Sequence, residues 1–397
     1  MTTARTQHST DRSPALYLAF ELGWSEWKLA FASAPADAPR LRSLGARDTQ
    51  AVLQEIAKAK QRFGLPADAP VFCCYEAGRD GFWLHGWLSA QGLLNAVVDS
   101  ASIETKRRRR RAKKDRLDAA KLVSMLIRYH GGEQKVWGVV QVPGVEDEDR
   151  RQLHRDLLEL KGERTQHINR IKGLLAGCGL AVTGIGADFP AVLAALRQWD
   201  GQPVATVLHK RLLREWERHQ LVERQIRDLE NKRARQIRTS RARPMARVRK
   251  LLGLRGIGAN SAWLFTQEFF SWRAIRNRKQ LAALAGLAPT PYDSGASSRE
   301  QGISKAGNRR LRTMAVEIAW CWLQFQPQSA LSQWYARRFG GSNGRQRRIG
   351  IVALARKVLV ALWRYLETGH VPEGAATVDW KAKMQGGQRA EAGGACR

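Results

Sequence analysis

The sequence predicts an α/β domain over residues 15–145, a helical arm, and a mostly helical C-terminal domain. Three observations support this fold class. Short apolar runs alternate with helical patterns in the first third of the chain. Leucine and isoleucine residues recur every three or four positions in the highly charged middle. After residue 250, Gly-rich turns separate apolar helical runs.

In the N-terminal domain, residues 16–33 predict two strands around a turn at Gly23. Residues 71–78 and 93–100 predict two more short strands. Helical patterns lie between and after these strands, at 49–63, 82–91 and 115–129. Residues 1–14 precede the first strand and are expected to be flexible. This alternation favours an α/β layer structure.

The middle and the end of the chain predict helices. Apolar stripes run from Leu153 to Leu175 and from Trp216 to Leu229, which indicates two antiparallel helices in a coiled-coil arm. Arm and basic linker together cover 146–250, and the C-terminal domain covers 251–368. Residues 369–397 contain few apolar side chains, so we expect a disordered tail.

The charge balance indicates a polyanionic partner. The 397 residues include 67 Lys+Arg and 36 Asp+Glu, a formal net charge of +31. This excess goes far beyond what solubility needs, and nucleic acid is the commonest partner of such a chain. An anionic membrane surface is the competing interpretation. However, no run of about 18 uncharged apolar residues is present to span a bilayer, so we expect no membrane association.

Cysteine and histidine usage indicates a reducing compartment. The five cysteines are odd in number, form no C-x-x-C motif, and include the adjacent pair Cys73 and Cys74 in an apolar run. The N-terminus lacks an adequate signal-peptide core. The histidines show no metal-binding spacing, which argues against structural zinc. We therefore expect a cytoplasmic protein.

Four acids in the N-terminal domain are candidates for a metal site. Glu21 and Glu76 interrupt apolar strands, where a carboxylate needs a cationic partner. Asp115 and Asp118 open a helix three residues apart, so they share one face with Cβ atoms about 5–6 Å apart. If both strands are neighbours in one sheet that the helix covers, the four carboxylates converge. Oxygen ligands without His or Cys favour Mg²⁺ or Mn²⁺, which promote phosphoryl transfer.

A simpler interpretation of the acids remains open. Asp115 and Asp118 can serve only to complement the positive end of a helix dipole. Glu21 and Glu76 can lie at hydrated strand ends, where they need no metal ion. Taken singly, each acid favours this interpretation; the combination of all four in so basic a chain favours the metal site.

A block of positive charge directly precedes the helix that carries Asp115 and Asp118. We expect it to contact nucleic-acid phosphates beside the metal site. Its eight basic residues are Lys106, Arg107, Arg108, Arg109, Arg110, Arg111, Lys113 and Lys114.

Gly256 and Gly258 form a Gly-Ile-Gly turn between two apolar helical runs, a pattern similar to the helix-hairpin-helix. Glycines without side chains let backbone N–H groups approach a phosphate, so both are candidates for nucleic-acid binding. An ordinary helix–helix turn with Gly at a C-cap explains the same residues equally well.

A loop-rich stretch from 281 to 312 carries the candidate nucleophile. Ser294 lies beside a glycine, and Ser297 and Ser298 follow as weaker candidates. A serine hydroxyl can attack a phosphodiester when cations stabilise the developing charge. The groups that we expect to contact nucleic acid here are Arg299, Lys305, Asn308 and Arg309. From the pattern alone, a Ser-Gly pair more often marks only a turn.

Together these residues resemble the DEDD-type transposases of the insertion sequence 110 family. The N-terminal resemblance rests on AFELGWSEWKLAF, YEAG and KKDRLDAAKL. The C-terminal resemblance rests on LRGIGANSAWLF, LAALAGLAPTPYDSG and GISKAGNRRLR. The order and spacing of the motifs agree over about residues 15–340. The combination is specific, although each motif alone is not.

The resemblance implies an RNase H-like N-terminal domain, similar to the Holliday-junction resolvase RuvC. Its four catalytic acids, which bind Mg²⁺ (or Mn²⁺), fall on Glu21, Glu76, Asp115 and Asp118. The family has Asp at the first position, so Glu21 departs from the pattern and its extra methylene changes the reach of that ligand. The resemblance also implies that Ser294 is the catalytic nucleophile of the C-terminal transposase domain.

The resemblance further implies partners and a reaction. A non-coding bridge RNA would pair with donor and target DNA and set the target site, and the chain would act as a homo-oligomer, a dimer or a tetramer. In that assembly the acids of one subunit would meet Ser294 of another. The implied activity is RNA-guided DNA strand exchange through a covalent serine–DNA intermediate, associated with the nucleoid during the reaction. The alternatives are a RuvC-like metal-dependent nuclease or junction resolvase, and an inactive nucleic-acid-binding copy.

Overall fold

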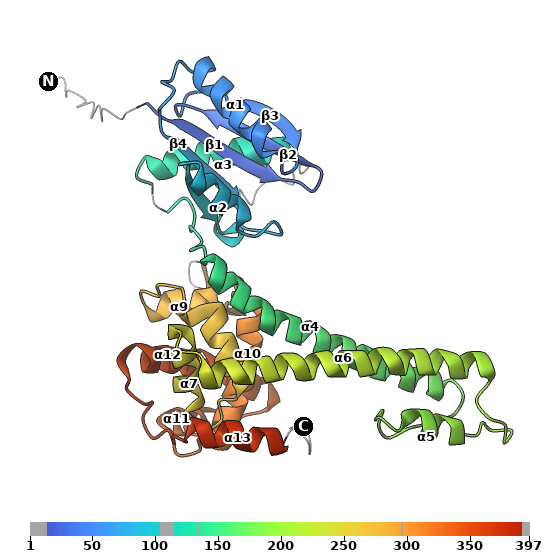
Figure 1. Ribbon diagram of the computed structural model, residues 1–397. Helices are drawn as coiled ribbons and strands as arrows, with labels where there is room; N and C mark the ends of the chain where they lie inside the picture. The colour runs from blue at the N-terminus through green and yellow to red at the C-terminus, as the bar shows by residue number, and fades with distance from the viewer. Residues whose placement is uncertain (1–13, 104–114, 134, 295–296, 391–397) are drawn as a thin grey trace. The chain divides into compact units, whose positions relative to one another are not determined.

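The computed structural model describes residues 14–103, 115–133, 135–294 and 297–390. The chain divides into two compact units, Met1–Pro143 and Gly144–Arg397. The first unit is a mixed α/β structure and the second is mainly helical (Figure 1). Among the described helices, none combines the length and the apolar composition that crossing a bilayer requires.

The first unit is built on a five-stranded sheet in the order β3-β2-β1-β4-β5. Its strands are β1 (Leu16–Leu22), β2 (Glu26–Ala32), β3 (Arg40–Gly45), β4 (Val71–Glu76) and β5 (Leu94–Val98). Strands β1, β2 and β3 pair antiparallel, whereas β4 lies parallel to β1 and β5 parallel to β4. The carboxyl ends of three strands therefore meet at one edge.

Helices cover both faces of this sheet. Helices α1 (Thr49–Arg62) and α2 (Trp83–Ala90) pack on the face that carries Leu18 and Phe20. Helix α3 (Asp115–His130) packs on the opposite face, and the short helix η1 (Ser100–Ser102) follows β5. The alternation of β1 side chains between the two cores follows from the two-residue period of a strand.

The expected elements of this unit are confirmed within one or two residues at each end. Strand β3 was not predicted, because Arg40 is its only buried residue and its pattern is mostly polar. Arg40 pairs with Glu55 of α1 at 2.5 Å, with side-chain exposures of 7% and 10%. This buried ion pair fixes the edge strand to the helix.

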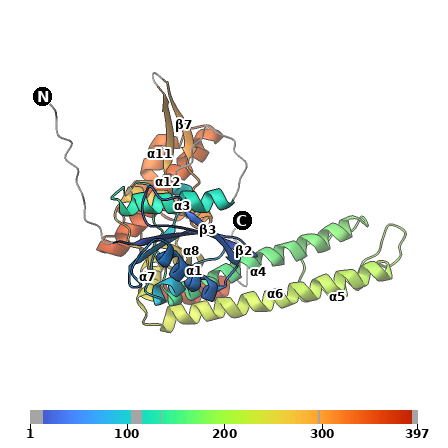
Figure 2. The same cartoon turned by 90° about the horizontal axis from the view of Figure 1, so that it is seen from above.

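The second unit contains the arm and a helical core. Helices α4 (Val145–Ala176) and α6 (Thr206–Thr239) lie side by side, and α5 (Phe189–Ala195) caps their far end (Figures 1 and 2). An ion pair links Lys161 with Glu230 and a hydrogen bond joins His167 to Glu215, so the two helices run antiparallel. The predicted pair of long antiparallel helices is confirmed.

The helical core of this unit surrounds buried aromatic side chains, among them Trp263 and Trp322. Its helices are α7 (Arg243–Leu252), α8 (Ala259–Phe265), α9 (Arg278–Leu284), α10 (Arg309–Phe325), α11 (Ala330–Phe339) and α12 (Gly344–Thr368). A single π-helical turn, η2 (Thr266–Phe270), continues α8. Strands β6 (Pro289–Ser294) and β7 (Ser297–Ile303) form an antiparallel hairpin where we expected only loop.

The segment after residue 369, expected to be disordered, contains helix α13 (Trp380–Ala390) in its described part. Trp380 and Met384 pack against the helical core. Lys383 donates hydrogen bonds to the carbonyl oxygens of Leu252, Leu254 and Ile257 at 2.8–3.2 Å. A few anchoring side chains thus order a segment whose average composition is polar.

Candidate active site

Glu21 and Glu76 lie next to each other at the carboxyl edge of the sheet. In the parallel pairing of β1 with β4, Phe20 is opposite Tyr75, and the two glutamates come one residue later on each strand. Tyr17 and Ala19 on β1, and Cys74 on β4, face α3. The two-residue period therefore assigns both glutamates to the same face as α3.

Helix α3 runs antiparallel to these two strands. Its last residue, His130, lies with its ring 5.9 Å from Tyr17 and 4.0 Å from Phe72, near the strand starts. Leu122 lies level with Cys74, whose Sγ is 3.9 Å from the Leu122 carbonyl oxygen. From that level, four helical residues back to Asp118 and two strand residues on to Glu76 each cover about 6 Å. The backbone thus brings Asp118 to the edge that holds both glutamates.

The described side chains at this edge do not make up the complete set of four predicted metal ligands. Glu21 and Asp118 are half-buried and Glu76 is exposed, while the side chain of Asp115 lies outside the described part of the chain. Among the side chains that are described, no group of three or more His, Cys, Asp or Glu could hold a metal ion. The four-acid metal site stays a prediction, supported by the placement of the backbone.

A further acid at this edge was missed by sequence reasoning. Asp99 directly follows β5, the third strand whose carboxyl end reaches the edge. Its backbone N–H donates to the carbonyl oxygen of Gly138 at 2.9 Å. The signal was the Asp-Ser pair directly after an apolar strand, a position where parallel sheets often hold functional side chains.

The basic block that we expected to contact phosphates, residues 106–114, lies outside the described residues. Its role therefore stays a prediction. The described chain resumes at Asp115, the first residue of α3.

The β6–β7 hairpin carries the serine candidates at its tip. Ser294 is the last residue of β6 and pairs with Ser297, the first residue of β7. Asp293 pairs with Ser298 and Tyr292 with Arg299. All three candidate serines therefore lie at or next to the end of the hairpin, by the pairing of its backbone.

The base of the hairpin is fixed by two glycines. A Cβ at Gly286 would meet the carbonyl oxygen of Ala306 at 2.6 Å, and one at Gly307 would meet that of Leu284 at 2.5 Å. Both residues also have positive φ, at 66° and 123°. Only glycine fits such a close approach of two backbones. The motif that resembles the transposase family therefore has a structural role at this position.

The other candidates near the hairpin have different environments. Lys305 is exposed and has a positive φ of 55°, and Arg309 is exposed at the first turn of α10. Asn308 caps α10 by accepting from the Leu311 N–H at 3.1 Å, and it contacts Glu268 at 3.5 Å. Lys305 and Arg309 are thus accessible to a phosphate, whereas Asn308 has a structural role.

Gly256 and Gly258 lie in a short turn between α7 and α8, as expected. Gly256 has a φ of 85°, and a Cβ there would meet the Phe325 side chain at 3.2 Å. Arg255 N–H donates to the Ala376 carbonyl oxygen at 3.1 Å. Packing against the core accounts for Gly256, so the phosphate-binding role of this turn stays a prediction.

A buried ionic cluster joins the arm to the core, and sequence reasoning did not find it. Glu268 on η2 is 1% exposed and accepts from Nε of Arg151 at 3.0 Å and of Arg155 at 2.9 Å. Burial alone would raise the pKa of Glu268, but the two guanidiniums outweigh it and the pKa is lowered. Burial, followed by the charge of Arg233, lowers the pKa of neighbouring His154 to about 4.

Comparison of the sequence with known proteins shows which class of protein the chain belongs to. The sequence model of the transposase IS116/IS110/IS902 family matches residues 248–333, which include the whole hairpin. A putative transposase y4rJ of Sinorhizobium fredii is 41% identical over 377 residues, covering 91% of this chain and 94% of its own length. A probable family 20 transposase of Pseudomonas aeruginosa is 30% identical over 57% of this chain and 66% of its own.

A transposase for the insertion sequence element IS1328 of Yersinia enterocolitica is 29% identical over 31% of this chain and 37% of its own. The class of protein is therefore a transposase, whose substrate class is DNA. The chain belongs to the IS116/IS110/IS902 family of transposases.

Proposed function

We propose that this transposase exchanges DNA strands through a covalent link between Ser294 and DNA. The observation that carries the proposal is the position of Ser294, the last residue of β6 at the tip of a hairpin within the family match. A hairpin tip can enter a nucleic-acid groove without moving the core. Arg299 comes two residues after Ser297, the backbone partner of Ser294, and we assign its guanidinium to stabilise charge on the attacked phosphate.

The reaction that we propose conserves the number of phosphodiester bonds. The Ser294 hydroxyl oxygen attacks phosphorus, a P–O bond of the DNA breaks, and the hydroxyl proton passes to the departing strand end. The hydroxyl of a partner strand then attacks the serine phosphodiester, and Ser294 regains its proton. Each step replaces one phosphate ester with another, so no nucleotide hydrolysis is required.

The acids at the carboxyl edge of the first unit fit a hard divalent cation by their chemistry. Glu21, Glu76, Asp115 and Asp118 would hold Mg²⁺ or Mn²⁺ through oxygen atoms alone. The ion would supply electrostatic stabilisation of charge on the transferring phosphate. The backbone positions of Glu21, Glu76 and Asp118 at one edge support this assignment.

We further propose a guide RNA and a homo-oligomeric working form, a dimer or a tetramer. The net charge of +31 supports the RNA partner, because one duplex alone needs far fewer neutralising cations. Pairing of the RNA with donor and target DNA would then set the sequences that are joined. The exposed Lys305 and Arg309 supply phosphate contacts near the hairpin.

The test is a recombination assay with donor and target plasmids and the RNA transcribed from the element's non-coding end. Ser294→Ala should abolish both recombination and the protein–DNA adduct that survives denaturation. Ser297→Ala, at the paired position of the hairpin, is the matched control and should retain both. Loss of the adduct in Ser297→Ala with retention in Ser294→Ala would transfer the nucleophile to Ser297.

The second candidate function is a metal-dependent nuclease in which activated water cuts the strand. The cluster of acids at one sheet edge favours this alternative independently of the hairpin. The two functions differ in one product. Cleavage of the DNA without any adduct, unaffected by Ser294→Ala, would establish the nuclease and exclude the serine mechanism.

A further inference from the structure

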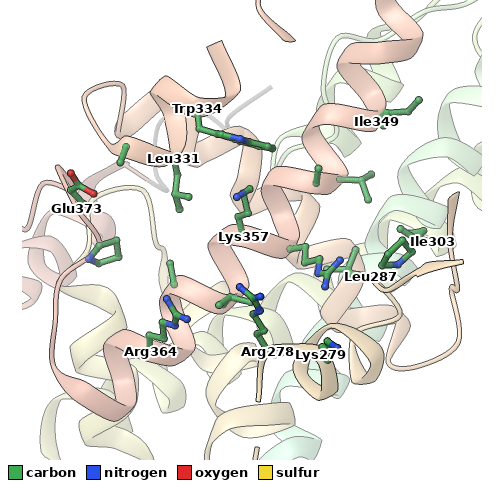
Figure 3. Close-up of a pocket in the computed structure, with 18 of the residues that line it drawn as sticks. Arg278, Lys279, Leu287, Ile303, Leu331, Trp334, Ile349, Lys357, Arg364 and Glu373 are labelled. Atoms are coloured by element: carbon green, nitrogen blue, oxygen red, sulfur yellow. The ribbon is translucent and has the colours of Figure 1, made fainter. Parts of the chain in front are cut away.

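A large groove opens on the second unit, and its lining contains none of the candidate site residues described above. Its volume is about 1400 Å³, and helices α11 and α12, the loop 370–373 and the base of the β6–β7 hairpin line it. Figure 3 shows Trp334 and Lys357 close together in this groove, with Arg278 and Arg364 projecting from neighbouring helices. The volume exceeds the roughly 300–1,000 Å³ of small-ligand pockets, so a segment of a polymer fits it better than a small molecule.

The floor of the groove is a partly buried apolar face of α12. One face of this helix packs in the core through Leu354, Val358 and Leu362. A second face presents Val352 and Val360, half-buried, and Ile349, which is 54% exposed. Val352 and Val360 reach the edge of the core, whereas Ile349 leaves apolar surface exposed to a ligand in the groove.

Cations surround this apolar floor. Arg345, Arg348, Arg356, Lys357 and Arg364 line the groove from α12, and Arg278 and Lys279 line it from α9. Glu373 is the acid among the lining residues. Within the described part of the chain, none of the seven cations forms an ion pair. Lys357 instead lies 4.5 Å from the Trp334 ring centroid. The groove therefore attracts an anion with apolar parts.

Single-stranded nucleic acid has this combination of properties. Unpaired bases stack on aromatic and apolar side chains while cations neutralise the backbone. A duplex keeps its bases stacked inside and offers the apolar floor nothing to contact. A second copy of this chain, at a net charge of +31, would bring like charge to the seven cations.

The position of the groove relates it to the hairpin. Pro289 and Ile303, which pair at the base of the hairpin, also line the groove. Ser294 lies five residues beyond Pro289 along β6, a distance of about 17 Å. The lined face of α12 from Arg345 to Arg364 extends about 28 Å. A strand that occupies the groove can therefore continue along the hairpin to its tip.

We propose that this groove binds a single-stranded stretch of the DNA substrate next to the phosphate that Ser294 attacks. The proximity of the bound strand to the phosphate that Ser294 attacks rests on the proposed function. The occupancy of the groove itself is measured by binding alone and does not depend on catalysis.

The test is the binding of a fluorescein-labelled 20-nucleotide oligo-dT to the full chain in a Ser294→Ala background, over a range of salt concentrations. The groove variant carries Arg356→Gln, Lys357→Gln and Arg364→Gln. Loss of three phosphate contacts should lower the salt slope by about 2 and the affinity roughly 100-fold at 0.1 M salt. The matched control carries Arg337→Gln, Arg338→Gln and Arg347→Gln, exposed positions outside the groove, and should bind as the parent does.

A second measurement tests the floor. An oligonucleotide with 5-iododeoxyuridine should cross-link to the peptide that contains Trp334, and Ile349→Asp, at an exposed site, should weaken binding without lowering the Tm. Equal loss in the two triple variants, or cross-links only elsewhere, would overturn the proposal. A fall in oligomeric mass with unchanged oligo-dT binding would assign the groove to a second copy. A larger loss for an RNA oligomer than for DNA would assign it to RNA.

Discussion

The buried cluster at the base of the arm gives a quantitative prediction. Glu268→Gln removes the carboxylate that pairs with both Arg151 and Arg155, whose side chains are 9% and 23% exposed. The buried guanidinium of Arg151 and the partly buried guanidinium of Arg155 then lose their paired carboxylate. Breaking a buried pair from one side costs about 3–5 kcal/mol. For a unit of this size, that lowers the Tm by roughly 6–20 °C.

The assay is thermal unfolding of the full chain at pH 7, compared with Glu223→Gln. Glu223 pairs with Arg164 across the arm at 3.3 Å, where the side chains are 29% and 36% exposed. An exposed pair contributes about 0–1 kcal/mol, so this control should change the Tm little. Replacing Arg151 and Arg155 by Met in the Glu268→Gln background should recover part of the loss. Equal shifts in Glu268→Gln and Glu223→Gln would refute the reasoning.

Three further predictions follow from named contacts. The folded-state pKa of His154 is lowered to about 4 by burial and then by Arg233, so the unfolded chain binds more protons between pH 6.5 and 4. Stability should therefore fall by about 3 kcal/mol as the pH drops through that window, and urea unfolding of His154→Leu should show a smaller fall. Lys383→Met removes one hydrogen-bond donor from each of three carbonyl groups, and should accelerate amide hydrogen exchange in 253–258 while leaving the arm unchanged. Glu21→Gln should lower Mg²⁺-dependent recombination roughly 100-fold, whereas Glu21→Asp should retain it; equal activity of both would remove Glu21 from the metal site.

Sequence periodicity predicted those parts of the fold in which local pattern and burial agree. Strands β1, β2, β4 and β5 have apolar runs, and α4 and α6 have clear stripes. The hairpin was missed because residues 289–303 contain two prolines, two glycines and three serines, a composition typical of loops. The pairing of β6 with β7 stabilises the extended backbone in spite of that composition.

The sequence predicted the part of the candidate site that follows from the order of strands and helices along the chain. The pairing of β1 with β4, which makes Glu21 and Glu76 neighbours, follows the expected α/β topology. The Glu268 cluster joins residues more than 100 positions apart, so no local pattern could indicate it. The groove was missed because Val352 and Val360 have the spacing of an ordinary helix core.

The length of the arm magnifies small changes at its base. Arg233 on α6 donates to Asn260 of α8 there, beside the Glu268 cluster. From Arg233 to Thr206 the helix extends about 40 Å. A rotation of roughly 5° at the base would displace the far end by about 3.5 Å, comparable to one base-pair step of DNA. The buried charged contacts at the base of the arm therefore limit how far its other end can move.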